Sequence, residues 1–134
     1  MMLRQASLAL LLLLAGCAAI PPAVPPDKAL VHIYRRAQPP NPADIAVFDG
    51  TRQIGALPEG SYLDYLTDPG PRVFKAEAPN AGNIPYATSL AAGQTYWFMV
   101  YILGDQLRGN AAIAPMDQAT AEKQMATLKP KNRF

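Results

Sequence analysis

Few side chains in this 134-residue chain could carry out catalysis. There is one histidine, His32, and the serines that follow the only cysteine are Ser61 and Ser89. A Ser–His–acid hydrolase needs a serine next to a base that a carboxylate orients, and neither serine lies in a Gly-x-Ser-x-Gly pattern. A small hydrolase that uses His32 is therefore the weakest function that we consider. We expect no enzymatic activity and assign no catalytic residue.

Three aspartates, Asp49, Asp64 and Asp68, lie at or near expected turns. Paired carboxylates can act as acid and base in glycoside hydrolysis, and calcium takes about six to eight oxygen ligands. Aspartate is also common in turns, where it bonds to the backbone, and this structural role is favoured here. With one histidine and one cysteine, zinc binding is not expected either. The sequence therefore predicts no metal and no cofactor.

The cysteine, Cys17, follows a segment that is organised like a secretory signal peptide. Arg4 precedes an apolar stretch from Ala6 to Leu14, and two small residues come directly before the cysteine. The apolar stretch is shorter than the roughly 20 residues that span a bilayer. We therefore predict a signal peptide over residues 1–16 rather than a permanent transmembrane helix.

The tetrapeptide Leu14-Ala15-Gly16-Cys17 resembles the lipobox of bacterial lipoproteins. The resemblance implies cleavage before Cys17, a diacylglycerol on its thiol, and an acyl chain such as palmitate on its new amino group. More than one acyl chain makes membrane anchoring durable. The alternative is a chance tetrapeptide within an ordinary signal peptide or a core helix.

The residue after the cysteine, Ala18, resembles the signal that sorts lipoproteins to the outer membrane. The expected location is the inner leaflet of the outer membrane, facing the periplasm, or the outside of the cell membrane in an organism with a single membrane. Residues 17–28 follow as a lipidated cysteine and a proline-rich tether, because prolines disfavour helix and sheet and favour an extended spacer.

The charge of the chain after cleavage is close to neutral. Removing residues 1–16 takes away Arg4, one of 12 Lys and Arg, so 11 basic residues remain against 10 acidic ones. Nucleic-acid binding usually needs a strongly basic surface, so no nucleic-acid partner is expected. The adjacent Arg35 and Arg36 could face phospholipid or a polyanionic sugar, or could simply end a solvated strand.

Short strands separated by Gly- and Pro-rich turns dominate the rest of the chain. They are predicted over residues 29–35, 45–57 (a hairpin with an Asp-Gly turn), 61–68, 72–78, 84–91, 95–103 and 107–114. One helix is predicted over residues 116–129, with Asp117 as its N-cap, followed by a frayed basic tail over residues 130–134. The pattern predicts one mainly β domain over residues 29–129, an antiparallel immunoglobulin-like or transthyretin-like sandwich with one short C-terminal helix.

Aromatic side chains are the best candidates for a binding surface. Tyr62 and Tyr65 lie on opposite faces of one expected strand, and Trp97 and Tyr101 share a face of the apolar strand over residues 95–103. We consider these four a possible partner surface. The face of that strand that does not enter the core is either exposed or covered by the helix. Coverage is favoured, because an amphipathic helix must bury its own apolar stripe.

Several short motifs follow one another in the order of a known family. They are Val31–Arg35, Val47–Gly50, Ile54–Leu57, Gly60–Tyr62, Pro69-Gly70 and Gly93–Phe98. Behind a lipobox, they resemble the bacterial lipoproteins catalogued as domain of unknown function 2846, and the pattern is similar to the broader PEGA-type β-sandwich modules of bacterial surface proteins. The resemblance spans about residues 30–103. It implies a small membrane-tethered sandwich and carries over no catalytic residue.

The sequence therefore predicts a membrane-anchored lipoprotein that presents a non-enzymatic β-sandwich to the periplasm. Its role would be that of an envelope-structural or protein-binding accessory module with an unidentified envelope protein as partner. The alternative is a module that binds peptidoglycan or another glycan, using exposed tyrosine and tryptophan faces together with edge carboxylates.

Overall fold

Ten strands and one helix occur in the part of the chain that the computed structural model describes, residues 24–37, 43–104 and 109–133. The strands are β1 (Ala29–Arg35), β2 (Ile45–Asp49), β3 (Arg52–Leu57), β4 (Ser61–Thr67), β5 (Gly70–Glu77), β6 (Gly82–Ile84), β7 (Tyr86–Leu90), β8 (Thr95–Leu103), β9 (Asn110–Met116) and β10 (Lys129–Arg133), and the helix is α1 (Gln118–Met125). They form a six-stranded sheet with the order β10-β4-β1-β8-β9-β6 and a four-stranded sheet with the order β3-β2-β5-β7. The predicted mainly β sandwich with one short helix is confirmed.

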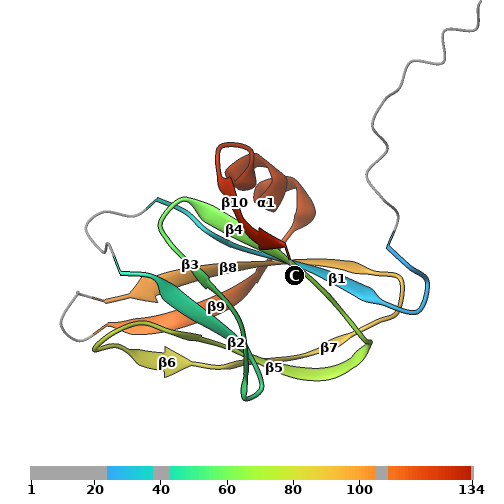
Figure 1. Cartoon of the computed structure of the whole chain (residues 1–134), viewed down its shortest axis with the longest axis horizontal. Coiled ribbons are helices and arrows are strands. Elements are labelled where there is room, and N and C mark those ends of the chain that lie inside the picture. The colour runs from blue at the N-terminus through green and yellow to red at the C-terminus, as the bar shows by residue number, and fades with distance from the viewer. Residues whose placement is uncertain (1–23, 38–42, 105–108, 134) are drawn as a thin grey trace, which may run out of the picture.

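The two sheets pack face to face, and α1 lies on the outer side of the six-stranded sheet (Figure 1). Most neighbouring strands are antiparallel, but β1 runs parallel to β8, β4 to β10, and β6 to β9. The six-stranded sheet is therefore mixed, while the four-stranded sheet is antiparallel throughout, as the sequence predicted for both sheets. The central strand β1 lies between β4 and β8, and these three strands carry the site described below.

Alternating side chains of both sheets fill the core. The strand β1 contributes Val31 and Ile33, β8 contributes Phe98 and Val100, and β5 contributes Phe74, and each of these is at most 2 % exposed. Phe74 and Phe98 meet between the sheets with their ring centroids 5.4 Å apart. Because successive strand residues point to opposite faces, the residues between these core positions form the outer face of the six-stranded sheet.

The strands around two prolines, Pro85 and Pro115, differ from those predicted. The predicted strand over residues 84–91 is two strands, since β6 joins the six-stranded sheet, β7 joins the other, and Pro85 lies between them. Proline has no N–H for a ladder, so the chain changes sheets there. Pro115, predicted to close a strand, lies within β9 opposite Phe98. Among the described residues β6 pairs only with positions 110–112 of β9, so Pro115 is at an open edge that tolerates proline.

The C-terminal helix is shorter than predicted and the tail is ordered into a strand. The helix ends at Met125 rather than at residue 129. Lys129 then donates its backbone N–H to the carbonyl oxygen of Gly60 at 3.0 Å, and β10 pairs with β4. A residue before proline avoids the helical conformation, so Pro130 directs Lys129 into an extended strand. The predicted division between a domain ending at residue 129 and a frayed tail is therefore wrong.

The end of the predicted tether is part of the folded domain. The backbone N–H of Gly93 donates to the carbonyl oxygen of Lys28 at 2.6 Å, and the Lys28 side chain pairs with Asp68. This hydrogen-bonded ion pair raises the pKa of Lys28 and lowers that of Asp68. The one helix of the described residues is too short to cross a membrane.

Candidate binding groove beside helix α1

A row of three side chains crosses the outer face of the six-stranded sheet. Residues 64, 32 and 97 are direct neighbours, since His32 of β1 pairs with Asp64 of β4 on one side and with Trp97 of β8 on the other. All three positions alternate with core residues, so their side chains emerge on the face that carries α1. The strand register, rather than closeness in sequence, brings a carboxylate, an imidazole and an indole together.

His32 is held between its two neighbours. Its Nδ1 lies 2.6 Å from Oδ1 of Asp64, and its ring centroid lies 5.8 Å from that of Trp97, with 31° between the planes. A carboxylate only accepts hydrogen bonds, so Nδ1 carries the proton and donates, which leaves Nε2 of a neutral ring as an acceptor. The His32 side chain is 22 % exposed and that of Asp64 is 45 % exposed, so the pair remains within reach of solvent and of a ligand.

The helix α1 forms the wall of the site. Asp117 is its N-cap, as predicted, and accepts a hydrogen bond from the backbone N–H of Thr120 at 2.9 Å. Hydrogen bonds from Thr120 lower the pKa of the Asp117 carboxyl. On the side facing the sheet, Ala121 is buried, and Gln124 accepts a hydrogen bond from the hydroxyl of the buried Tyr34. These contacts fix which helical residues face the row of three.

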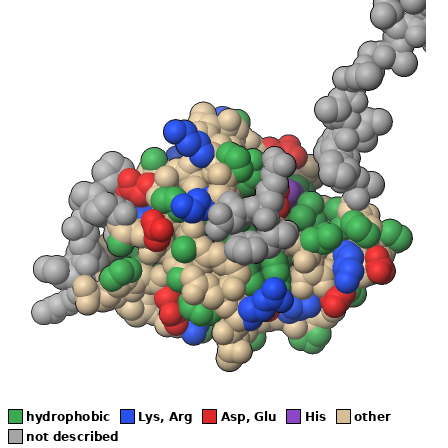
Figure 2. All heavy atoms as spheres, in the orientation of Figure 1, with side chains coloured by type: hydrophobic (Ala, Val, Ile, Leu, Met, Phe, Trp, Pro, Cys, Tyr) green, Lys and Arg blue, Asp and Glu red, His purple; other side chains and the backbone are tan. Residues whose placement is uncertain are grey.

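The space between α1 and the sheet is an open groove, which we call the α1 groove. It consists of two hollows of ≈ 380 Å³ and ≈ 780 Å³ that share His32, Asp64 and Glu122. Its lining combines aromatic and apolar side chains with carboxylates and amides: Val24, Leu30, His32, Tyr62, Asp64, Gln94, Thr95, Trp97, Gln118, Glu122, Met125, Ala126 and Leu128, with Gly93 at one end. Hydrophobic, acidic and basic side chains are likewise mixed over the face shown in Figure 2.

The predicted aromatic surface is only partly at this groove. Tyr62 and Trp97 line it, and both are half-buried. Tyr101 is half-buried and lies on the same face of β8 as Trp97, but outside the groove lining. Tyr65 is in the core at 9 % exposure, with its hydroxyl donating to Oδ2 of Asp49 at 2.7 Å, and burial raises its pKa. The prediction that Tyr65 belongs to a partner surface is therefore wrong.

The predicted carboxylates do not form a cluster. Asp49 accepts hydrogen bonds from Tyr65 and from Arg72, the latter at 2.6 Å, while Asp68 pairs with Lys28 and Asp64 with His32. Each carboxylate thus has a separate structural partner. Within the described ranges, no three His, Cys, Asp or Glu side chains are placed to hold a metal ion.

Neither serine of the described chain joins the His32–Asp64 pair. Ser61 is buried on the core side of β4, and its hydroxyl donates to the carbonyl oxygen of Pro58. Ser89 is in β7, which belongs to the other sheet. A Ser–His–acid arrangement is therefore not assembled from these residues.

The two adjacent arginines have different surroundings. Arg35 is 3 % exposed, and its Nη1 donates to the carbonyl oxygens of Ala43 and Leu57. Burial lowers its pKa from the ordinary value. Arg36 is exposed on the other flank of α1. Neither alternative considered from the sequence holds for Arg35, which faces no phospholipid or sugar and is not a solvated strand end, whereas Arg36 is exposed.

Sequence reasoning missed Gln118 and Glu122 as site residues. They are four positions apart, so they lie on one side of the helix, and Gln118 Nε2 donates to Glu122 Oε1 at 2.9 Å. The N-cap at Asp117 fixed the start of the helix, but the sequence contained no signal for how the helix would lie on the sheet.

The predicted lipidation site, Leu14, Ala15, Gly16 and Cys17, lies outside the described residues. No family model, no curated protein and no solved structure matches the chain.

Proposed function

We propose that this protein is a lipid-anchored envelope lipoprotein whose β-sandwich is a non-enzymatic binding module, with the α1 groove as its binding surface. The anchor would be the diacylated Cys17, and the family would be that of domain of unknown function 2846. The observation that carries the binding function is the groove itself, in which a half-buried indole lies beside an imidazole and two carboxylates.

The position of the anchor supports this proposal. Val24, the first described residue, lines the groove. Val24 is seven positions after Cys17, and a fully extended chain over seven positions spans at most about 25 Å. A lipidated Cys17 would thus hold the groove close to the membrane surface, where it would meet envelope proteins that are anchored in the same membrane.

The chemistry of the groove indicates a segment of an envelope protein as the partner. Asp64 and Glu122 would attract a cationic side chain, while Trp97, Leu30 and Val24 offer apolar contact beside them. A basic residue flanked by apolar residues complements such a surface. The groove is open along its length and therefore admits a continuous peptide segment.

Site-specific crosslinking in intact cells tests this proposal. A photoreactive amino acid at Gln118, exposed in the groove, should crosslink to one envelope protein. The same amino acid at Ser89, exposed on β7 of the other sheet, is the control and should not. Identical adducts from both positions, or none from position 118, would contradict the proposed binding surface.

A glycan is the second candidate ligand, because an indole that is bordered by carboxylates and amides also suits a sugar ring with its hydroxyl groups. Trp97 is the only tryptophan, so its fluorescence reports directly on the groove. Soluble peptidoglycan fragments should change its emission, and Glu122→Gln should weaken the response while Glu77→Gln, on β5 of the other sheet, should not. Unchanged emission at saturating fragment would exclude the glycan function for this groove.

A further inference from the structure

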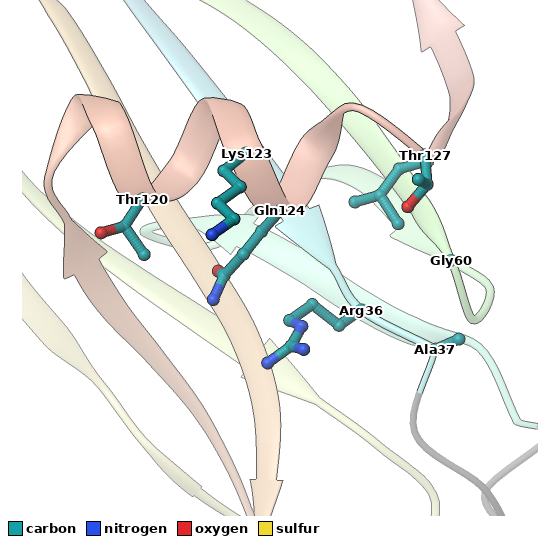
Figure 3. A pocket seen from close by; sticks show the side chains of 8 residues that line it. Arg36, Ala37, Gly60, Thr120, Lys123, Gln124 and Thr127 are labelled. Atoms are coloured by element: carbon teal, nitrogen blue, oxygen red, sulfur yellow. The ribbon is translucent and has the colours of Figure 1, made fainter.

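A second hollow lies on the opposite flank of α1, between the helix, the end of β1 and the turn before β4 (Figure 3). Its volume is ≈ 620 Å³. It is lined by two basic side chains and otherwise by neutral residues, namely Arg36, Ala37, Gly60, Thr120, Lys123, Gln124, Thr127 and Leu128. We call it the basic hollow. Leu128 is the one lining residue that the basic hollow shares with the α1 groove, and the two spaces are otherwise separate.

The two cations of the basic hollow have no carboxylate partner among the described residues, unlike three other basic residues of the domain. Lys28, Arg72 and Lys75 each pair with a carboxylate within 4.0 Å. Arg36 and Lys123 make no such ion pair with any described residue, and no acidic side chain lines the hollow. Both side chains extend into the same space from different elements (Figure 3). Two converging positive charges without a counter-charge favour an anion.

Neutral hydrogen-bond donors accompany the charges. The hydroxyl of Tyr34 donates to Oε1 of Gln124 at 2.5 Å. This bond occupies the amide oxygen, so the NH₂ group of Gln124 is left to donate elsewhere. Thr127 adds a hydroxyl to the lining. The helix cap fixes this wall, because Asp117 holds the first turn and Ala121 is buried against the sheet.

We propose that the basic hollow binds a phosphate group. Arg36 would contact two of its oxygens through the planar guanidinium, Lys123 would add a second charge, and Gln124 and Thr127 would donate to the remaining oxygens. A phosphate monoester carries about two negative charges near neutral pH, which matches two cations. The phosphate belongs either to a soluble monoester or to the diester headgroup of a phospholipid.

A titration followed by amide NMR shifts tests this inference on the full chain in non-ionic detergent at constant ionic strength. Glycerol 3-phosphate is the soluble monoester, and glycerophosphoglycerol is a phospholipid headgroup without its acyl chains. Saturable shifts at Gly60 and Thr127 should occur with at least one of them and not with chloride. Tighter binding of the monoester assigns a soluble ligand, and tighter binding of the diester assigns a lipid headgroup.

Charge-removing variants make the test specific. Arg36→Gln and Lys123→Gln, both at exposed positions, should each weaken binding at least about tenfold. Arg52→Gln removes an exposed charge from β3 of the other sheet and should change the affinity less than about twofold. Shifts that equal those with chloride, or equal affinities in all three variants, would overturn the inference. Trp97 lines the α1 groove and not the basic hollow. Its emission therefore tests the proposed function separately from phosphate binding in the basic hollow.

Discussion

Replacing Arg35 with methionine should destabilise the domain strongly. The side chain is 3 % exposed, and its Nη1 donates to the carbonyl oxygens of Ala43 at 2.7 Å and Leu57 at 2.8 Å. Leu57 is the last residue of β3 in the four-stranded sheet, whereas Arg35 ends β1 in the other. The arginine therefore ties the two sheets together. Methionine keeps an apolar stem in place but removes both hydrogen bonds.

The expected loss follows from these two bonds. A hydrogen bond from a charged group contributes about 1.5–3 kcal/mol, so the free energy of unfolding should fall by about 3 kcal/mol or more. With a urea dependence near 1.5 kcal/mol/M, the unfolding midpoint falls by about 2 M. Far-UV circular dichroism of the full chain in non-ionic detergent measures this shift.

The neighbouring arginine provides a matched control. Arg36 is exposed and makes no ion pair with the described residues. Arg36→Met should therefore change the free energy of unfolding by no more than about 0.5 kcal/mol. Equal midpoint shifts for the two methionine variants would refute the assignment of Arg35 to the structure and Arg36 to the surface.

Three further substitutions test the packing and the helix. Phe98→Ala empties the centre of the core, where Phe98 is 2 % exposed, and urea unfolding should show a loss of about 3–5 kcal/mol. Gly55→Ala would place a Cβ 2.6 Å from a methyl of Leu63 in the core, so the same measurement should show a loss of about 1–3 kcal/mol, and an unchanged midpoint would contradict this packing. Asp117→Ala removes the N-cap of α1 and should lower the melting temperature at pH 7. Hydrogen bonds from Thr120 hold the pKa of Asp117 below its ordinary value, so the difference from wild type should be full above that value, near pH 4, and should decrease as the pH falls through the lowered pKa. An equal melting temperature for the variant and wild type at pH 7 would argue against the cap.

Local patterns in the sequence were sufficient to predict most strands. The alternation in β5 and the apolar run of β8 each have a local cause, and these strands occur close to where the pattern placed them. The predicted hairpin of β2 and β3 also occurs, but its turn is shifted by one residue: Asp49 pairs with Arg52, so the turn residues are Gly50 and Thr51 rather than Asp49 and Gly50. The N-cap at Asp117 is equally local. Such features depend on residues that are a few positions apart, which a sequence displays directly.

Long-range pairing is what the sequence could not show. The row of Asp64, His32 and Trp97 depends on the antiparallel register of β1 with β4 and on its parallel register with β8. Tyr65 and Tyr62 alternate as predicted, but only the assembled sheets show that Tyr65 faces the core. The same holds for Arg35, which is buried because β3 ends beside it.

The predicted C-terminal end of the helix was wrong for the same reason, because it depends on long-range strand pairing. Residues 116–129 have a helical pattern, yet the chain leaves the helix at Met125 because a strand can form along β4. The local sequence pattern cannot show that the edge of β4 is available for pairing, so it could not predict the shorter helix. The α1 groove and the basic hollow lie on the two flanks of this helix.

The mass of the native protein tests the central claim, a lipid-anchored binding module, most directly. Protein purified from the membrane fraction should begin at Cys17 and carry a diacylglycerol and one further acyl chain on that residue. The Cys17→Ser variant should retain residues 1–16 and carry no lipid. A native protein that retains residues 1–16, or whose Cys17 is an unmodified thiol, would contradict the anchor and with it the proposed position of the α1 groove at the membrane.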